Sequence, residues 1–502
     1  PGGTPEATTA PDGVPGGTPW VAQPDYKSGP AGQSVTTLSS IGTSGIQVDR
    51  LQVVTPDSAG ILTTENGGFG VDMWRGTNMA GALELLARVP ARLASPTLAG
   101  LVRRLALTPA TPPEGVSDGE QLAVSRIGVM MTLADYPAAL DLLSVMPRQG
   151  RGAGLLRAEA ELRFLTGDNV AGCAMVGAEV RRNQADFWQK ALIFCQLLSD
   201  QSEKAELGLS MLREIGNDDA LFFRLSEAIS GAKTVPLGDV TEPSALATAM
   251  IGHAALEVAP EALSSLGAGV LRALALNAKL TPEIRLAAME RAAMLGVFGD
   301  GALRKLVLKI AGQLPPDADP AAPSDGAANA ISGAISGAVQ RARLYATAAR
   351  ADVPAAKAEA ASRALRSAAE AGVHRAAARI FADELALVPA STENTWFAAD
   401  AVRATVATGD VERARSWIQL LTRSAQLSAE SVEVLAGLQA LTRIMGATPA
   451  DADGKPLDAR DARRTVLARA LLAGLGNASD AMSWLALADP LGESLASAPM
   501  PS

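Results

Sequence analysis

The sequence is poor in the residues that most catalytic and metal sites need. It holds two histidines and two cysteines in 502 residues. His253 and His374 lie roughly 120 residues apart in Ala-rich stretches, where a metal cluster or a catalytic triad is hard to assemble. His-Glu-x-x-His, Cys-x-x-Cys, Walker and Gly-x-Ser-x-Gly motifs are also missing from the sequence. We therefore predict a non-enzymatic protein with no cofactor and no metal site, and we interpret both histidines as packed or surface residues.

Basic runs and long apolar runs are missing as well. The net charge of −9 argues against a nucleic-acid surface, because phosphate binding needs clustered Lys and Arg. The longest apolar stretch, 245–256, is interrupted by His253 and falls short of the ~18 residues that a membrane span needs. We therefore expect no nucleic-acid partner and no membrane span in this chain, and we expect a signal or anchor segment upstream of Pro1.

What the chain does contain favours helices. Aromatic residues make up 4% and β-branched runs are scarce, whereas alanine is frequent. A helix-breaking turn with an acidic residue returns at Asp135, Asp168 and Asp200, at intervals of about 33 and 32 residues, close to the tetratricopeptide period of about 34. Asp410, in Gly409-Asp410, repeats the form. Each aspartate can cap the following helix, and the small residues after it let two helices approach closely. We predict an all-α fold, an α-solenoid of irregular tetratricopeptide-like (TPR-like) helical hairpins.

Composition divides the chain into five parts. Proline and glycine dominate the start, where Pro-Gly-Gly-Thr-Pro occurs twice, and such a segment cannot bury enough apolar area to fold alone. Partial alternation over 46–54 is typical of one short strand, which Ile61 and Leu62 could join in a hairpin. The predicted parts are an extended Pro/Gly-rich arm (1–66), a first helical array (67–312), a Pro-rich linker (313–327), a second helical array (328–490) and a tail (491–502).

The two cysteines give information about the cellular compartment of the protein. Cys173 and Cys195 each lie about eleven residues from a predicted bend near Gln184, so an antiparallel hairpin would bring them level with one another. A disulfide here would indicate an oxidising compartment such as a bacterial periplasm. The alternative is a pair of buried free thiols that pack as small apolar side chains.

Of the six tryptophans, Trp20 in the arm and Trp74 at the start of the helices are the candidate partner contacts.

Several short motifs carry a resemblance to a known group of proteins. They are 73–77 (Met-Trp-Arg-Gly-Thr), 95–98 (Ser-Pro-Thr-Leu), 167–173 (Gly-Asp-Asn-Val-Ala-Gly-Cys), 186–188 (Asp-Phe-Trp), 194–196 (Phe-Cys-Gln) and 211–216 (Met-Leu-Arg-Glu-Ile-Gly). Together they resemble alphaproteobacterial tetratricopeptide-like α-solenoid envelope proteins over residues 60–230. The resemblance implies a periplasmic helical solenoid and transfers no functional residue, since the tetratricopeptide consensus is only partly kept.

From these observations we expect a periplasmic scaffold or adaptor in a multi-protein envelope assembly. The resemblance points to an accessory ring or disk of the flagellar motor, with ring or stator proteins as partners and the chain itself oligomeric. One alternative is a component of the peptidoglycan-processing machinery, because lytic transglycosylases also carry Ala-rich helical superhelices. Another is a cytosolic TPR adaptor, which free thiols at Cys173 and Cys195 would favour.

Overall fold

The computed structural model describes residues 55–314, except 94, 150, 239 and 241, residues 330–425, and residues 435 and 438. Contacts divide the chain into two units, Pro1–Val53 and Val54–Ser502, and the described residues all belong to the second. Trp20, the strand predicted over 46–54, most of the predicted linker and the tail lie outside the described residues.

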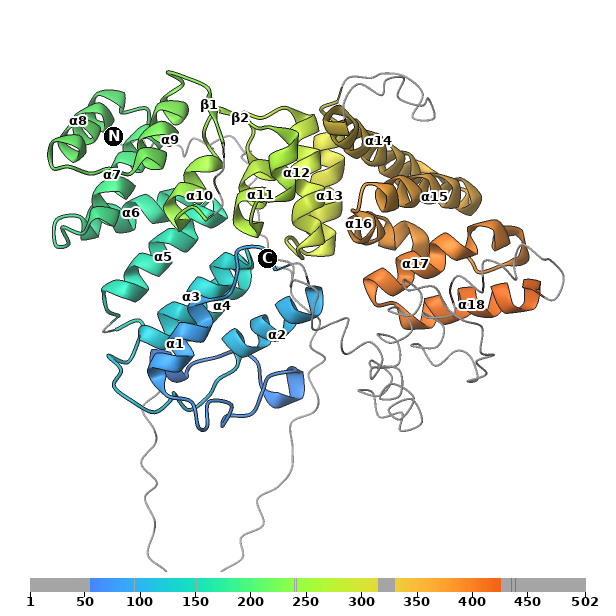
Figure 1. Ribbon diagram of the computed structural model, residues 1–502, viewed down its shortest axis with the longest axis horizontal. Helices are drawn as coiled ribbons and strands as arrows, with labels where there is room; N and C mark the ends of the chain where they lie inside the picture. The colour runs from blue at the N-terminus through green and yellow to red at the C-terminus, as the bar shows by residue number, and fades with distance from the viewer. Residues whose placement is uncertain are drawn as a thin grey trace, which may run out of the picture. The chain divides into compact units, whose positions relative to one another are not determined.

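The described residues form an all-α fold, as predicted (Figure 1). The α-helices are α1 Met79–Ala87, α2 Pro96–Leu107, α3 Gln121–Thr132, α4 Tyr136–Ser144, α5 Ala153–Thr166, α6 Asn169–Glu179, α7 Asp186–Leu198, α8 Ser202–Glu214, α9 Ala220–Ser230, α10 Ala245–Ile251, α11 Ala268–Leu276, α12 Pro282–Met294, α13 Asp300–Ala311, α14 Ala330–Arg350, α15 Pro354–Glu370, α16 His374–Ala386, α17 Ala398–Thr408 and α18 Val411–Ala425. Two short strands, β1 Val235–Pro236 and β2 Leu256–Glu257, pair in parallel. Among the described helices, none combines the length and hydropathy of a transmembrane segment.

Local sequence signals set the helix ends. Asn78 and Ser244 cap α1 and α10 through their side chains, and Pro354 occupies the first turn of α15. Gly167 and Gly409 end α5 and α17 in the left-handed conformation that glycine adopts without a steric penalty. The helices α4, α6 and α8 begin 33 residues apart, at Tyr136, Asn169 and Ser202.

Most neighbouring helices in the chain also pack against one another, including α5 with α6, α7 with α8, and each successive pair from α14 to α18. The segment after α9 keeps these neighbour contacts and adds long-range ones. Its helix α10 packs on α5, and α11 contacts α3, so helices of residues 245–276 lie against helices about 80 residues or more earlier in the chain (Figure 1). These two long-range contacts create the cavities described below.

Residues on both sides of two predicted boundaries are in contact. Residues 55–66 of the predicted arm fold against the helices: the Asp57 carboxylate accepts a hydrogen bond from the Ala123 amide at 2.8 Å. Ile61 and Leu62 form no strand, because both amides donate to the Leu107 carbonyl at 2.8 and 3.1 Å. The helices on either side of the predicted linker also pack together, α12 with α14 and α13 with α16, so the two predicted arrays share one contact unit.

Candidate binding cavity

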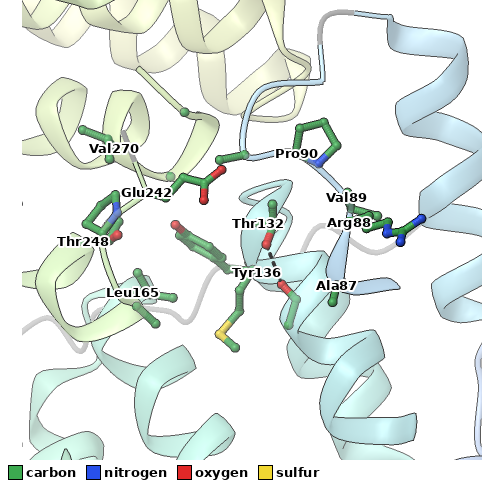
Figure 2. Close-up of a pocket in the computed structure, with 17 residues that line it drawn as sticks. Ala87, Arg88, Val89, Pro90, Thr132, Tyr136, Leu165, Glu242, Thr248 and Val270 are labelled. Atoms are coloured by element: carbon green, nitrogen blue, oxygen red, sulfur yellow. Dashed lines mark hydrogen bonds between the residues drawn. The ribbon is translucent and has the colours of Figure 1, made fainter. Parts of the chain in front are cut away.

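Three cavities adjoin one another where α10 and α11 meet the earlier helices. The large cavity, of about 560 Å³, lies between the segment after α1, the end of α3, and the starts of α10 and α11 (Figure 2). The small cavity, of about 210 Å³, shares four lining residues with it: Tyr136, Leu165, Thr248 and Gly269. The side cavity, of about 480 Å³, shares Arg272 with the small cavity. The two largest volumes fall in the range of ordinary ligand pockets.

Small residues join two walls of the large cavity. The Ala268 amide donates to the Ala91 carbonyl at 3.0 Å, which fixes the start of α11 to the segment after α1. A Cβ atom at Gly267 would lie 3.0 Å from the Ala91 Cβ, so glycine here allows a close approach without displacing Ala91. Figure 2 shows the Tyr136 ring reaching into the cavity, with its hydroxyl on the side of Thr248 and Glu242.

Tyr136 stands at the junction of the large and small cavities. It is 2% exposed, and no hydrogen bond within the described residues involves its hydroxyl. Burial raises the pKa of Tyr136 to about 12, against the opposing charge of Arg272, so the phenol stays protonated at neutral pH and can donate. A Cβ at Gly269 would lie 3.1 Å from this hydroxyl and 3.3 Å from the Thr248 methyl. All three residues line both cavities, and we call the place where they meet the neck.

The small cavity holds His253 against an aromatic wall. The His253 ring lies 5.8 Å from that of Phe194, and its Nε2 is 3.3 Å from the Asn169 side-chain nitrogen. Burial and the charge of Lys279 lower the pKa of His253, so the imidazole is neutral at neutral pH. The Asn169 Oδ1 atom is buried without a hydrogen-bond partner. His253 is thus packed, as the sequence suggested.

A disulfide braces this wall. Cys173 on α6 and Cys195 on α7 are bridged, with their Cα atoms 5.7 Å apart, so the predicted disulfide is confirmed over the free-thiol alternative. Phe194, next to Cys195, packs edge-to-face on Phe164, which lines the small cavity. The bridge therefore holds α6 and α7 in place behind the cavity wall.

Arg272 separates the small and side cavities. Its guanidinium carbon lies 5.1 Å from the Tyr136 ring centre and 4.9 Å from that of Phe298. Its Nε atom is buried without a hydrogen-bond partner. Burial lowers the pKa of Arg272, while Tyr136 and Asp135 act in the opposite direction. Both carboxylates of the side cavity are already paired: Asp135 with Arg103 at 2.6 Å and Asp300 with Arg379 at 2.7 Å.

The predicted helix caps are found at three of four positions. Asp135 accepts from the Ala138 amide at 3.4 Å, and Asp168 and Asp410 accept from the third residue after each at 3.3 and 3.1 Å. Asp200 lies in the predicted turn, but the prediction that it caps the following helix is wrong. Asp200 adopts a left-handed φ of 55°, so the turn takes one more residue and Gln201 precedes α8 without a side-chain cap.

Trp74 also differs from its prediction, because it is 8% exposed and belongs to the core rather than to a partner surface. Sequence reasoning missed Tyr136 and Arg272. Tyr136 directly follows a capping aspartate, which places it at a helix start, but no local signal marks Arg272.

Within the described residues, no group of three or more His, Cys, Asp or Glu side chains could hold a metal ion. No protein-family model, curated protein or solved structure matches the chain.

Proposed function

We propose that this chain is a non-enzymatic scaffold of the bacterial periplasm that holds part of a partner in the cavities around Tyr136 and Arg272. The observation that carries the proposal is the Cys173–Cys195 disulfide between α6 and α7, behind the wall of the small cavity. Disulfides persist in oxidising compartments and are rare in the cytosol, which favours the periplasm over a cytosolic adaptor.

The chemistry of the cavity groups supports binding rather than catalysis. A general acid or base works best with a pKa near the operating pH, whereas burial raises the pKa of Tyr136 to about 12 and lowers that of His253. His253 contacts the Asn169 amide, which is neither a nucleophile nor a carboxylate that could orient the ring for proton transfer. These groups suit hydrogen bonding to a bound molecule.

The assembly we propose is an accessory ring or disk of the flagellar motor, in which the chain is oligomeric. The support is the resemblance of residues 60–230 to periplasmic helical scaffolds. Crosslinking of intact cells, purification of the tagged chain from the envelope fraction and mass spectrometry test it. Recovery of flagellar ring and stator proteins is expected. Recovery of peptidoglycan enzymes would instead favour the cell-wall machinery, and cytosolic proteins alone would contradict both.

The compartment is tested separately by trapping thiols in growing cells with acid and then alkylating them before and after reduction. We expect Cys173 and Cys195 to resist alkylation until they are reduced. A chain whose two cysteines are alkylated without reduction would contradict the periplasmic proposal, and a Cys173→Ser variant gives the mass expected for a free thiol at Cys195.

A further inference from the structure

We propose that Arg272 and Tyr136 bind a carboxylate group in the small cavity, and that the rest of the ligand passes the neck at Gly269 into the large cavity. This inference rests on the proposed binding role of the cavities and names the chemical class of what they bind. Arg272, Tyr136 and Gly269 all line the small cavity, and the last two also line the large one.

The first support is the unmatched guanidinium. In the described part of the chain, Nε of Arg272 is the only buried arginine nitrogen without a hydrogen-bond partner. Other arginines with buried side chains have acceptors: Arg126 binds four backbone carbonyls and Arg341 binds Glu290 through two nitrogens. Arg272 itself is half-buried, and its buried Nε lacks an acceptor; since a buried donor without an acceptor is unfavourable, a ligand acceptor is the simplest complement for this atom.

The second support is how Arg272 is held. Two aromatic rings, of Tyr136 and Phe298, contact the guanidinium and fix its place, but their faces accept no conventional hydrogen bond. Phe298 has a φ of 67°, which is strained for a bulky residue, and Ala134 has a φ of 55°. Both residues line the side cavity beside Arg272. Non-glycine residues held in sparsely populated backbone conformations cluster at active sites and ligand clamps.

The third support is the balance of charge, which selects a carboxylate. No acidic side chain lines the small cavity, and Arg272 is its one charged group, since His253 is neutral there. One guanidinium with a neighbouring phenol hydroxyl matches the single charge of a carboxylate, and the guanidinium fork fits its two oxygens. A phosphate group carries more charge than these donors would neutralise. The carboxylate can belong to a peptide C-terminus or to a small aliphatic acid.

Calorimetric titration of the oxidised full chain tests the inference. The probes are N-acetyl-trialanine with a free carboxylate, the same peptide as its C-terminal amide, and hexanoate. We expect the free acid to bind at least about tenfold more tightly than the amide, and Arg272→Gln to remove this preference. Tyr136→Phe is expected to weaken binding about fivefold, because it removes one donor without changing the ring. Tighter binding of the peptide or of hexanoate identifies the source of the carboxylate.

Glycine variants supply the matched control. Gly269→Ala adds a methyl at the neck and should weaken the peptide at least about tenfold, whereas Gly100→Ala adds a methyl that meets nothing within 4 Å and should bind as the parent does. Equal binding of acid and amide would overturn the carboxylate inference and leave the scaffold proposal standing. Failure of the parent chain to bind any acid at about 1 mM would overturn it too. If Arg272→Gln fails to fold, Tyr136→Phe and Gly269→Ala decide the result.

Discussion

At the scale of single residues, buried Arg126 joins three segments that lie far apart in the sequence. It is 1% exposed and donates to the carbonyls of Ala59, Ala106 and Thr108 at 2.7 to 2.9 Å. We predict that Arg126→Met lowers the free energy of unfolding by about 3–5 kcal/mol, because it leaves several buried carbonyls without donors. Urea denaturation measures this. Arg88→Met, at an exposed pair with Glu84, should change it by less than about 0.5 kcal/mol. Similar losses for both variants would contradict the prediction.

His253 makes stability depend on pH. Burial, and then the charge of Lys279, lower its pKa in the folded chain, so the unfolded chain takes up a proton first as the pH falls through about 6.5. The free energy of unfolding should therefore fall on acidification from pH ~7.5 to ~5.5. We predict that His253→Gln reduces this loss, and that adding His374→Gln, whose pKa burial also lowers, reduces it further. An unchanged pH dependence in the double variant would contradict the assignment.

At the scale of helices, glycine sets the distance between α5 and α6. A Cβ at Gly172 would lie 2.7 Å from the Phe164 ring, whereas one at Gly177 on the same helix meets nothing within 4 Å. We predict that Gly172→Ala destabilises the chain by about 1–3 kcal/mol through overpacking. Gly177→Ala should stabilise it by about 0.5–1 kcal/mol, because alanine favours a helix. Thermal unfolding of the two variants measures both effects. Stabilisation by both substitutions would show that α5 and α6 leave room for a methyl group at Gly172, which would contradict the prediction.

The helices themselves could be predicted because their signals are local. An aspartate after a glycine or a tight turn marks the starts of α4, α6 and α18, and the cysteine pair follows from one hairpin. Asp200 shows the limit of this reasoning, since one extra turn residue displaced the cap. The cavities could not be predicted, because they depend on α10 packing on α5 and on Arg272 reaching Tyr136, 136 positions earlier. No spacing rule connects residues so far apart.

At the scale of the contact unit that holds the described residues, a buried ion pair connects α12 and α14 across the proline-rich segment. Arg341 and Glu290, 4% and 6% exposed, meet through two hydrogen bonds of 2.6 and 2.8 Å. We predict that Glu290→Gln destabilises the chain by about 3–5 kcal/mol and that Glu290→Leu with Arg341→Leu costs less, since no buried charge is then left alone. Asp72→Asn, at an exposed pair, is the control and should have little effect.

Calorimetry of the same variants tests whether the two predicted arrays are independent. Because α12 and α13 pack against α14 and α16, we expect the described helices to unfold in a single transition that Glu290→Gln moves as a whole. Two separate transitions, of which Glu290→Gln shifts only that of the later helices, would show that the two predicted arrays unfold independently.

The most direct test of the central claim, that the cavities hold a partner, is site-specific photocrosslinking in intact cells. A photoreactive residue replaces Glu242, which lines the large cavity, or Glu203, an equally charged and exposed position on α8 that lines none of the three cavities. The account predicts a discrete crosslinked band from position 242 that Arg272→Gln abolishes, and none of that size from 203. The same band from both positions would contradict the claim, and persistence of the band in Arg272→Gln would contradict the role of Arg272 in holding the partner.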